Sequence, residues 1–306
     1  MLKSEGNQTC SVDAAYRKHE RRWKSHRYTY AVVSRRSRGI SIGLNLSPGK
    51  ECNFKCIYCQ VHREIRPLCR DVDINRLQME LDAILRDEKS GSLYEAAPFN
   101  LLPPLKRGVR DIAFSGDGEP TASPVFDAAV RIAVRARKRF ELADTKIVLI
   151  TNASRLDKPE VCAALEVMDK NNGEIWAKLD AGTEEYFQSV NRSNVPLEKI
   201  LDNIRNAARV RPLVIQTLWL RLSGAVPADS EIEAYGNNLN RLIESGGQLK
   251  TLQLYTIART PLEPYVSRLT NDELDCIADM VRERVPVTVE VFYGVDPLRE
   301  GGEKYG

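Results

Sequence analysis

The chain has 306 residues, of which 42% are hydrophobic and 28% are charged, and its formal net charge is +3. This length allows one large domain or two ordinary ones, and this composition is ordinary for a soluble protein. The net charge is too small to argue by itself for a nucleic-acid partner, and no apolar run approaches the length of a membrane-spanning helix.

The cysteines and the N-terminal segment indicate the compartment. Seven cysteines occur, and outside one loop they are scattered with no pairing pattern, which favours a reducing environment. The segment from Met1 to Cys10 is polar and has no apolar signal-peptide core. We therefore expect a cytoplasmic protein with no membrane partner.

The first segment with a marked composition runs from Tyr16 to Arg38. It holds nine Lys or Arg residues against the single acidic Glu20, with aromatic residues between them. The basic residues are Arg17, Lys18, Arg21, Arg22, Lys24, Arg27, Arg35, Arg36 and Arg38, and the aromatic residues between them are Trp23, Tyr28 and Tyr30. Clustered cations with stacking aromatics are typical of RNA binding. The alternative interpretation is a solvated, partly helical lead-in that covers one end of the core.

A strand-like run over residues 39–46 leads into a loop with three cysteines, Cys52, Cys56 and Cys59. The C-x₃-C-x₂-C spacing lets one short loop wrap an iron–sulfur cluster, because cluster irons are held by Cys thiolates. Three thiolates cover three of four irons and would leave the fourth open. The alternative is a zinc site in which His62 supplies a fourth ligand. Disulfides are disfavoured, because three cysteines leave an odd count.

After this loop, helical and strand-like patterns alternate along the chain. We expect helices over residues 73–88, 123–140, 158–169, 194–210, 229–244 and 270–284. We expect strands over residues 39–46, 109–114, 146–150, 174–180, 213–220, 251–257 and 287–292. Residues 89–108, rich in proline, are expected to form a long loop. Ser123 is expected to cap its helix with Pro124 in the first turn, and Thr270 with Glu273 predicts a capping box.

This alternation predicts βαβ units and a parallel sheet. About six units fit, so we expect an α/β fold, a TIM-like partial (β/α)₆ barrel over residues 39–292, since a complete barrel needs more strands. Residues 1–38 are expected to form a basic N-terminal extension and residues 293–306 a C-terminal tail. The turn Ser34-Arg35-Arg36 precedes the first expected strand and is expected at the mouth of the barrel.

The carboxyl ends of the strands carry the active site in parallel barrels. The strand that ends at Phe114 is followed by Gly118 and Glu119, where glycine lets the backbone approach a ligand and the carboxylate faces an ammonium group. Thr151 and Asn152 end the next strand and are expected to hydrogen-bond a ligand; the alternative for Asn152 is an ordinary tight turn.

The next strand predicts a catalytic pair. Ile175, Ala177 and Leu179 alternate with Trp176, Lys178 and Asp180, so the last three share a face. A buried Lys178–Asp180 pair is costly unless it is well satisfied, so we interpret the two as catalytic, with Lys178 either a proton donor or a Schiff-base amine. The alternative is a salt bridge at the barrel rim.

Further candidates follow later strands. They are Gln216, Arg221, Tyr255 and Arg259, with Asn191-Arg192 in the loop after Asp180. Of these, Gln216 and Tyr255 are expected to bind cofactor, and Tyr255 is the best candidate to contact an adenine.

The C-x₃-C-x₂-C loop, with the aromatic Tyr58 just before Cys59, resembles the signature of the radical S-adenosylmethionine (SAM) enzymes. The resemblance extends from about residue 30 to about residue 290. It implies a [4Fe–4S] cluster whose open iron chelates SAM, reductive cleavage to methionine and a 5′-deoxyadenosyl radical, and hydrogen abstraction from a substrate. It implies that Tyr58 contributes to the cofactor site and that Gly118-Glu119 holds the SAM amino group. Asp117 stands where the family's Gly-Gly-Glu motif has its first glycine.

Four segments together resemble a narrower group, the iron–sulfur oxidoreductases related to the wyosine-base synthase. They are residues 34–36, 176–183, 191–192 and 254–259. That enzyme acts on tRNA and carries a second cluster on three further cysteines, whereas this chain has only Cys10 before the loop and Cys69 after it. We therefore expect a different radical reaction.

The resemblance implies a separate electron donor, such as a flavodoxin or a ferredoxin. The substrate expected is an RNA base, which the basic segment favours, or a small molecule or peptide, which the modest net charge favours. The alternative class is a non-catalytic iron–sulfur or zinc-bound module for RNA binding or redox sensing, which leaves Glu119 and Lys178 without a use.

Overall fold

The computed structural model describes residues 23–65, 67, 69–259 and 261–294. Its centre is one sheet of eight strands in the order β1-β2-β3-β4-β5-β6-β8-β10. The strands are β1 (Thr29–Ser34), β2 (Gly39–Leu44), β3 (Val109–Phe114), β4 (Lys146–Thr151), β5 (Gly173–Lys178), β6 (Leu213–Leu218), β8 (Leu249–Tyr255) and β10 (Val289–Phe292). Strand β1 is antiparallel to β2, and every later neighbour pairs in parallel.

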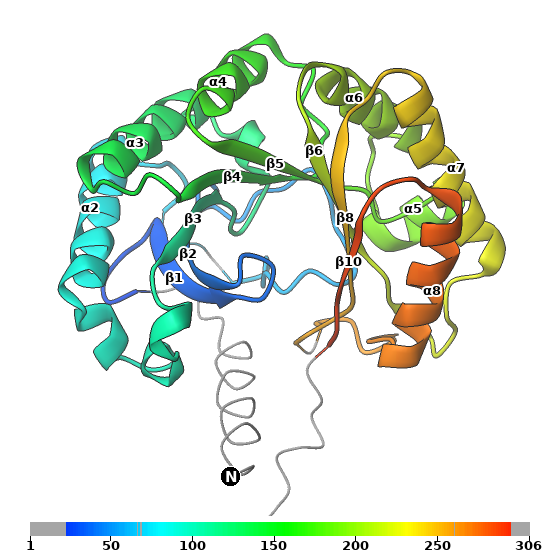
Figure 1. The fold of residues 1–306 in the computed structure, drawn as a ribbon, viewed down its shortest axis with the longest axis horizontal. Coiled ribbons are helices and arrows are strands. Elements are labelled where there is room, and N and C mark those ends of the chain that lie inside the picture. The colour runs from blue at the N-terminus through cyan, green and yellow to red at the C-terminus, as the bar shows by residue number, and fades with distance from the viewer. Residues whose placement is uncertain (1–22, 66, 68, 260, 295–306) are drawn as a thin grey trace, which may run out of the picture.

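Helices connect the parallel strands and form the outer layer. They are α2 (Ile74–Ser90), α3 (Phe126–Arg139), α4 (Pro159–Asp169), α5 (Glu184–Asn191), α6 (Leu197–Val210), α7 (Asp229–Glu244) and α8 (Asn271–Arg284). Figure 1 shows the sheet curled into an arch with the helices along its outer side and the two edge strands facing each other across the open side. The predicted TIM-like partial barrel is confirmed.

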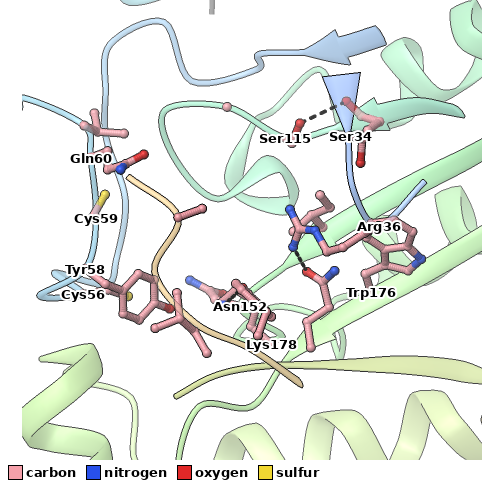
Figure 2. A pocket seen from close by; sticks show the side chains of 18 of the residues that line it. Ser34, Arg36, Cys56, Tyr58, Cys59, Gln60, Ser115, Asn152, Trp176 and Lys178 are labelled. Atoms are coloured by element: carbon pink, nitrogen blue, oxygen red, sulfur yellow. Dashed lines mark hydrogen bonds between the residues drawn. The ribbon is translucent and has the colours of Figure 1, made fainter. Parts of the chain in front are cut away.

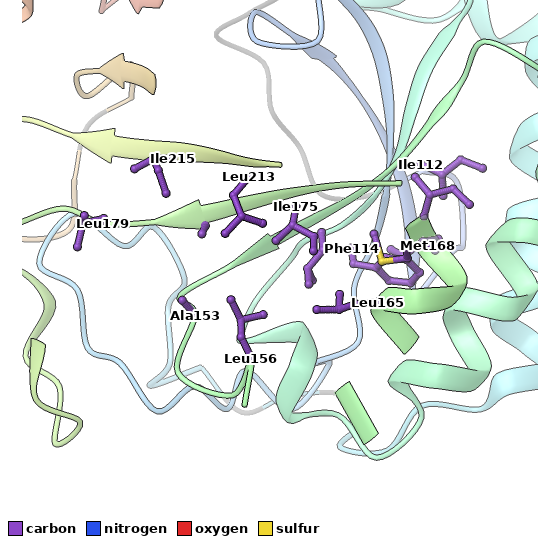
Figure 3. Packing of buried hydrophobic residues seen from close by; sticks show 14 of the residues in the cluster. Ile112, Phe114, Ala153, Leu156, Leu165, Met168, Ile175, Leu179, Leu213 and Ile215 are labelled. Atoms are coloured by element: carbon purple, nitrogen blue, oxygen red, sulfur yellow. The ribbon is translucent and has the colours of Figure 1, made fainter. Parts of the chain in front are cut away.

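The convex face of the sheet forms the main core. Ile112, Phe114, Ile175 and Leu213 point from neighbouring strands toward the helices and are 0–2% exposed. Figure 3 shows this packing against the side chains of α4. Continuous apolar strands of this kind are expected where helices cover a parallel sheet.

The concave face is different, because most of its side chains are polar. Its small apolar layer consists of Ala113, Val148, Trp176 and Val214, with Ile150 packed against it. Ile175 lies in the outer core and Trp176 in this inner layer, so the alternation predicted for this segment holds as far as Lys178. It does not extend to Asp180, which follows the end of β5 and does not line the concave cavity. The concave face therefore has polar positions left over for a site.

Several local features differ from expectation. Strand β1 lies within the segment expected to be an N-terminal extension, and it is the edge strand of the main sheet. Helix α3 begins at Phe126, after a short 3₁₀ turn (Pro120–Ala122), so the predicted Ser123 cap is wrong; Ser123 instead ends that turn.

The capping box of Thr270 and Glu273 at α8 is confirmed.

The segment expected as one long loop holds three 3₁₀ turns, Ser92–Glu95, Phe99–Leu101 and Pro104–Lys106. A further two-stranded sheet, of β7 (Arg221–Leu222) and β9 (Val266–Ser267), was not expected. In the part of the chain that the structure describes, no helix is both long and apolar enough to cross a membrane.

The turn between β1 and β2 lies at the amino ends of the parallel strands, opposite the cysteine loop, which follows the carboxyl end of β2. The expectation that this turn lies at the mouth is therefore wrong: it forms the floor. Across the open side, Arg38 of the turn pairs with Glu290 of β10, with 3.1 Å between the guanidinium nitrogen and the carboxylate oxygen.

Candidate functional site

One cavity of about 330 Å³ lies on the concave face of the sheet. It is bordered by the cysteine loop, the loops after β3 and β4, and side chains of β5, β6 and β8. Eleven of the twelve residues predicted for the site line it: Cys52, Cys56, Tyr58, Cys59, Gly118, Glu119, Thr151, Asn152, Lys178, Gln216 and Tyr255. The twelfth, Asp180, is not among the lining residues and is only 1% exposed.

The cysteine loop is fixed to the barrel by its apolar residues and its backbone. Phe54 and Ile57 are buried, and Phe54 packs edge-on against Phe187 of α5 with ring centroids 5.6 Å apart. The Ile57 amide donates to the carbonyl of Val190 at 2.9 Å. Because these residues face the core, the three cysteines between and beside them are left to line the cavity.

Two of the sulfur atoms receive N–H donors. The amide nitrogen Nδ2 of Asn191 lies 3.4 Å from Cys56 Sγ, and a guanidinium nitrogen of Arg63 lies 3.7 Å from Cys59 Sγ. Such donors stabilise sulfur that carries negative charge, as the thiolate ligands of an iron–sulfur cluster do. The donor set, three free thiols with N–H groups aimed at two of them, therefore fits an iron–sulfur cluster.

Burial opposes ionisation of Cys52 and Cys56 in the protein alone. It raises the pKa of Cys56 to about 12, with a further contribution from the nearby Asp180 carboxylate, and it raises the pKa of Cys52. Only a positively charged partner such as iron would hold these sulfurs as thiolates near neutral pH.

The zinc alternative loses its fourth ligand. His62 is exposed and does not line the cavity. Within the described residues, no three His, Cys, Asp or Glu side chains converge closely enough to hold one metal ion. Cluster ligands need not converge in this way, because each thiolate binds a different iron.

Gly118 is needed because the cysteine loop passes directly over it. A Cβ atom there would lie 2.0 Å from the carbonyl oxygen of Glu51. Glu119 beside it is 2% exposed, and Oε1 accepts hydrogen bonds from the Thr121 backbone, the Thr121 hydroxyl and the Thr151 hydroxyl. Its other oxygen, Oε2, accepts one, from the Asn152 amide at 2.7 Å. Burial raises the pKa of Glu119, and these hydrogen bonds oppose the rise.

Thr151 and Asn152 link loops as well as lining the cavity. The Thr151 hydroxyl donates to Glu119 at 2.7 Å, and Asn152 Nδ2 donates to Asn53 Oδ1 in the cysteine loop at 2.9 Å. Their polar groups are therefore already used in part by the protein, which favours a positioning role for both residues.

Lys178 and Asp180 form a satisfied pair. Lys178 Nζ lies 3.1 Å from Asp180 Oδ1 and donates to the Tyr255 hydroxyl at 2.6 Å. The carboxylate also accepts from the Tyr58 hydroxyl, from Asn191 Nδ2 and from the Leu218 amide. Burial would lower the pKa of Lys178, but Asp180 and Tyr255 outweigh it and raise the pKa above its usual range.

Lys178 thus faces the cavity as an ammonium group, whereas Asp180 is buried and contacts Lys178 from outside the cavity lining. Asp180 holds Lys178 and also holds Tyr58, whose pKa is raised well above its usual value by burial and by this carboxylate. Because Tyr58 directly precedes Cys59, Asp180 connects the cysteine loop to β5. Its burial behind the cavity wall favours a positioning role over the catalytic role that the sequence predicted.

The far end of the cavity holds residues from four elements. A guanidinium nitrogen of Arg36 lies 2.9 Å from Gln216 Oε1, and the guanidinium stacks over the rings of Trp176 and Tyr255. Figure 2 shows Cys56 and Cys59 at one end and Arg36 with Trp176 at the other, with Asn152 and Lys178 between them.

The weaker candidates divide. Asn191 and Arg259 line the cavity, as predicted. Arg221 instead pairs with Glu273 of α8, and Arg192 pairs with Glu263, so the structure does not bring these two to the site. Arg63 and Asn53 were not identified from the sequence, and no spacing or strand-end rule would have selected them.

The basic N-terminal segment does not present its aromatic residues. Trp23, Tyr28 and Tyr30 are 7%, 2% and 3% exposed, and Trp23 packs edge-on against Phe99. These three side chains therefore do not form the stacking surface that the RNA hypothesis required. Four of its cations, at positions 17, 18, 21 and 22, and Cys10 lie outside the described residues.

The fold and the site together define an α/β partial-barrel protein with a three-cysteine loop at the carboxyl ends of its strands. The sequence model of the Radical SAM superfamily matches residues 46–220, more than half of the chain. The chain belongs to the radical SAM superfamily.

Curated relatives are similar at low identity. A UPF0026 protein of Helicobacter pylori is 24% identical over 245 residues, which cover 79% of this chain and 70% of that protein. A UPF0026 protein of Methanocaldococcus jannaschii is 27% identical over 183 residues, 57% of this chain and 48% of that protein. A GTPase Obg of Brachyspira hyodysenteriae is 26% identical over 192 residues; the match covers 61% of this chain but only 24% of that protein.

Two solved structures are similar in shape. A structure of TYW1 with a lysine-pyruvate adduct bound has a TM-score of 0.46 at 19% identity, covering 81% of this chain and 74% of the other. A crystal structure of archaeal TYW1 has a TM-score of 0.48 at 15% identity, covering 93% and 90%. These values are too low to carry the activity of that enzyme over to this chain.

Proposed function

We propose that this chain holds a [4Fe–4S] cluster on Cys52, Cys56 and Cys59 and uses it with SAM to abstract a hydrogen atom from a substrate in the cavity. One observation carries the proposal: all three cysteines line the same cavity as the strand-end residues, with N–H donors aimed at two of the sulfurs. When bound, the reduced cluster supplies the electron that cleaves SAM to methionine and a 5′-deoxyadenosyl radical.

The chain's own residues provide the surroundings for this chemistry. Gly118 lets the loop backbone approach closely, and Glu119 Oε2, with one protein donor, keeps an acceptor position for the ammonium group of SAM. Gln216 and Tyr255 also line the cavity, and in this proposal the aromatic ring of Tyr255 contacts the adenine of SAM.

Lys178 acts as a fixed cation in this proposal, because an ammonium group with a raised pKa gives up its proton less readily than an ordinary lysine. An amine must be deprotonated to attack a carbonyl, and the Asp180 carboxylate 3.1 Å away stabilises the ammonium form. The Schiff-base alternative is therefore disfavoured for the resting protein.

The electron for the cluster comes from a separate donor such as a flavodoxin or a ferredoxin. The other described cysteines, Cys69, Cys162 and Cys276, do not line the cavity, which supports assigning only one cluster to it.

The test is anaerobic reconstitution of the full chain with iron and sulfide, followed by metal analysis and electron paramagnetic resonance of the reduced protein. We expect about four irons per chain and a cluster signal that changes when SAM is added. Cys56→Ala should lose the signal, and Cys276→Ala on the exposed side of α8 should keep it. Zinc without iron, or a cluster signal indifferent to SAM, would contradict the proposal and favour the non-catalytic module.

A further inference from the structure

Arg36 is a charged residue of the cavity that the proposed chemistry does not use. We propose that its guanidinium binds an anionic group of the substrate, a carboxylate or a phosphate, and so selects small organic anions. The identification of this ligand as the substrate rests on the proposed function above.

Arg36 forms no ion pair in the part of the chain that the structure describes. Among the residues that the structure describes, no carboxylate lies within ion-pair distance of its guanidinium, and Gln216 is its single hydrogen-bond partner. The neighbouring cations differ: Lys178 is paired with Asp180, and Arg38 with Glu290. A guanidinium has five N–H donors, so most of those of Arg36 remain for a ligand.

The acidic residue to consider as a counter-ion for Arg36 is Asp111, which also lines the cavity. It is 2% exposed, and its carboxylate accepts hydrogen bonds from the hydroxyls of Ser41 and Ser37. Burial raises the pKa of Asp111, and the Arg36 charge, after the two serine hydrogen bonds, opposes the rise. Asp111 therefore has partners of its own and attracts Arg36 only at longer range, because the two do not form an ion pair.

The guanidinium of Arg36 lies against two aromatic rings and is hydrogen-bonded at one edge. Its guanidinium carbon lies 5.0 Å from the ring centroid of Tyr255 and 5.7 Å from that of Trp176. A guanidinium that packs against aromatic rings keeps its fork oriented and loses little entropy when it binds. This is the arrangement that bidentate recognition of a carboxylate or phosphate requires.

A chain of amides orients the one partner that Arg36 has. Gln216 Nε2 donates to Gln253 Oε1 at 2.7 Å, and Gln253 Nε2 lies 3.4 Å from Glu290 Oε2. Because the nitrogen of the Gln216 amide is used toward Gln253, its oxygen faces Arg36. The site is therefore organised before a ligand arrives, which favours affinity.

The position of Arg36 also restricts the shape of the ligand. Figure 2 shows Arg36 at the end of the cavity away from Cys56 and Cys59, with Lys178 between. A substrate that places its reacting carbon near the cysteine end would reach Arg36 with a group several bonds away. In a cavity of about 330 Å³, this favours a small molecule with an acidic group distant from the reacting carbon.

The test measures anion binding by the full chain in the absence of SAM, through the tryptophan fluorescence to which Trp176 contributes. Inorganic phosphate and acetate are titrated separately at constant ionic strength, and Trp176→Phe identifies the signal. We expect saturable binding of at least one anion in the wild type, and which of the two binds more tightly distinguishes a phosphate from a carboxylate substrate.

The variants test whether Arg36 is responsible. Arg36→Gln should raise the dissociation constant about tenfold or more, as expected for loss of charge-assisted hydrogen bonds. Arg36→Lys keeps the charge without the fork and should bind with intermediate affinity. Arg131→Gln, on the exposed face of α3 and paired with Asp127, removes the same charge and should bind as the wild type does.

Equal affinity in the wild type and Arg36→Gln, equal loss in Arg131→Gln, or no saturable binding by the wild type would each overturn the inference. Failure of the proposed function looks different: the reconstituted protein would not cleave SAM, whatever its affinity for anions. If the protein cleaves SAM but binds neither anion, the inference about Arg36 is refuted and the proposed function is not.

Discussion

Asp180→Asn is the substitution that most directly tests how the site is held together. The carboxylate is 1% exposed and accepts from four groups, at 2.9 Å from the Leu218 amide, 3.1 Å from Lys178, 2.5 Å from the Tyr58 hydroxyl and 3.1 Å from Asn191. An asparagine has nearly the same shape, but it has one accepting oxygen and no charge. Lys178 would remain as a cation without a counter-charge.

The size of the loss follows from the burial of the two partners. Removing one member of a buried ion pair costs about 3–5 kcal/mol. The Lys178 side chain is 17% exposed and opens onto the cavity, so water offsets part of this loss. We therefore expect the free energy of unfolding to fall by about 3 kcal/mol, which for a slope of about 3 kcal/mol per molar urea lowers the midpoint by about 1 M.

Urea unfolding followed by circular dichroism measures this change. In Lys178→Met the lysine charge is absent, so adding Asp180→Asn to it should cost less than Asp180→Asn costs in the wild type. A loss below about 1 kcal/mol for Asp180→Asn, or strict additivity in the double variant, would refute the claim that this pair organises the site.

Three further predictions concern other parts of the protein. Hydrogen bonds from two lysines and a tryptophan outweigh burial and hold the pKa of Glu174 below its ordinary 4.5. The stability that the ionised Glu174 contributes is therefore present above pH 4.5 and is lost as the pH falls through the lower pKa of the folded state. Below about pH 4.5 the free energy of unfolding should fall more steeply with pH in the wild type than in Glu174→Gln, by at most about 1.4 kcal/mol per pH unit. Gly118→Ala should destabilise the protein by about 1–3 kcal/mol and reduce iron loading, because the Cβ would meet the Glu51 carbonyl; unchanged melting and iron content would contradict this. Asn191→Leu removes the N–H donor to Cys56 and should make the cluster's midpoint potential more negative in a redox titration, and an unchanged potential would show that the contact is not made to the cluster ligand.

The fold could be predicted from the sequence because local pattern and global topology agree. The helices and parallel strands alternate, and each strand that ends in polar residues brings them to the same edge of the sheet. That rule is why Glu119, Thr151 and Lys178, far apart along the chain, were expected together and were found lining one cavity. Strand β1 was missed because its segment is dominated by charge and aromatic content, which hid a short apolar run at Ala31–Val33.

The partners of the site residues could not be predicted, because they depend on tertiary distances. Nothing in the sequence marks Asn191 as a donor to Cys56, or Asp180 as a buried anchor rather than a cavity residue. The position of Arg36 was also unexpected, since its turn is at the floor of the barrel while its long side chain reaches Gln216 in the middle of β6. A strand-end rule selects only residues at the mouth.

The most direct test of the central claim is the formation of 5′-deoxyadenosine by the reconstituted full chain, reduced with dithionite and supplied with SAM under anaerobic conditions. The account predicts that the wild type and Cys276→Ala each form one methionine for every 5′-deoxyadenosine. It predicts that Cys56→Ala forms neither product. Absence of 5′-deoxyadenosine from a wild-type protein carrying its full complement of iron, or equal formation by Cys56→Ala, would contradict the assignment of this cavity as a radical SAM active site.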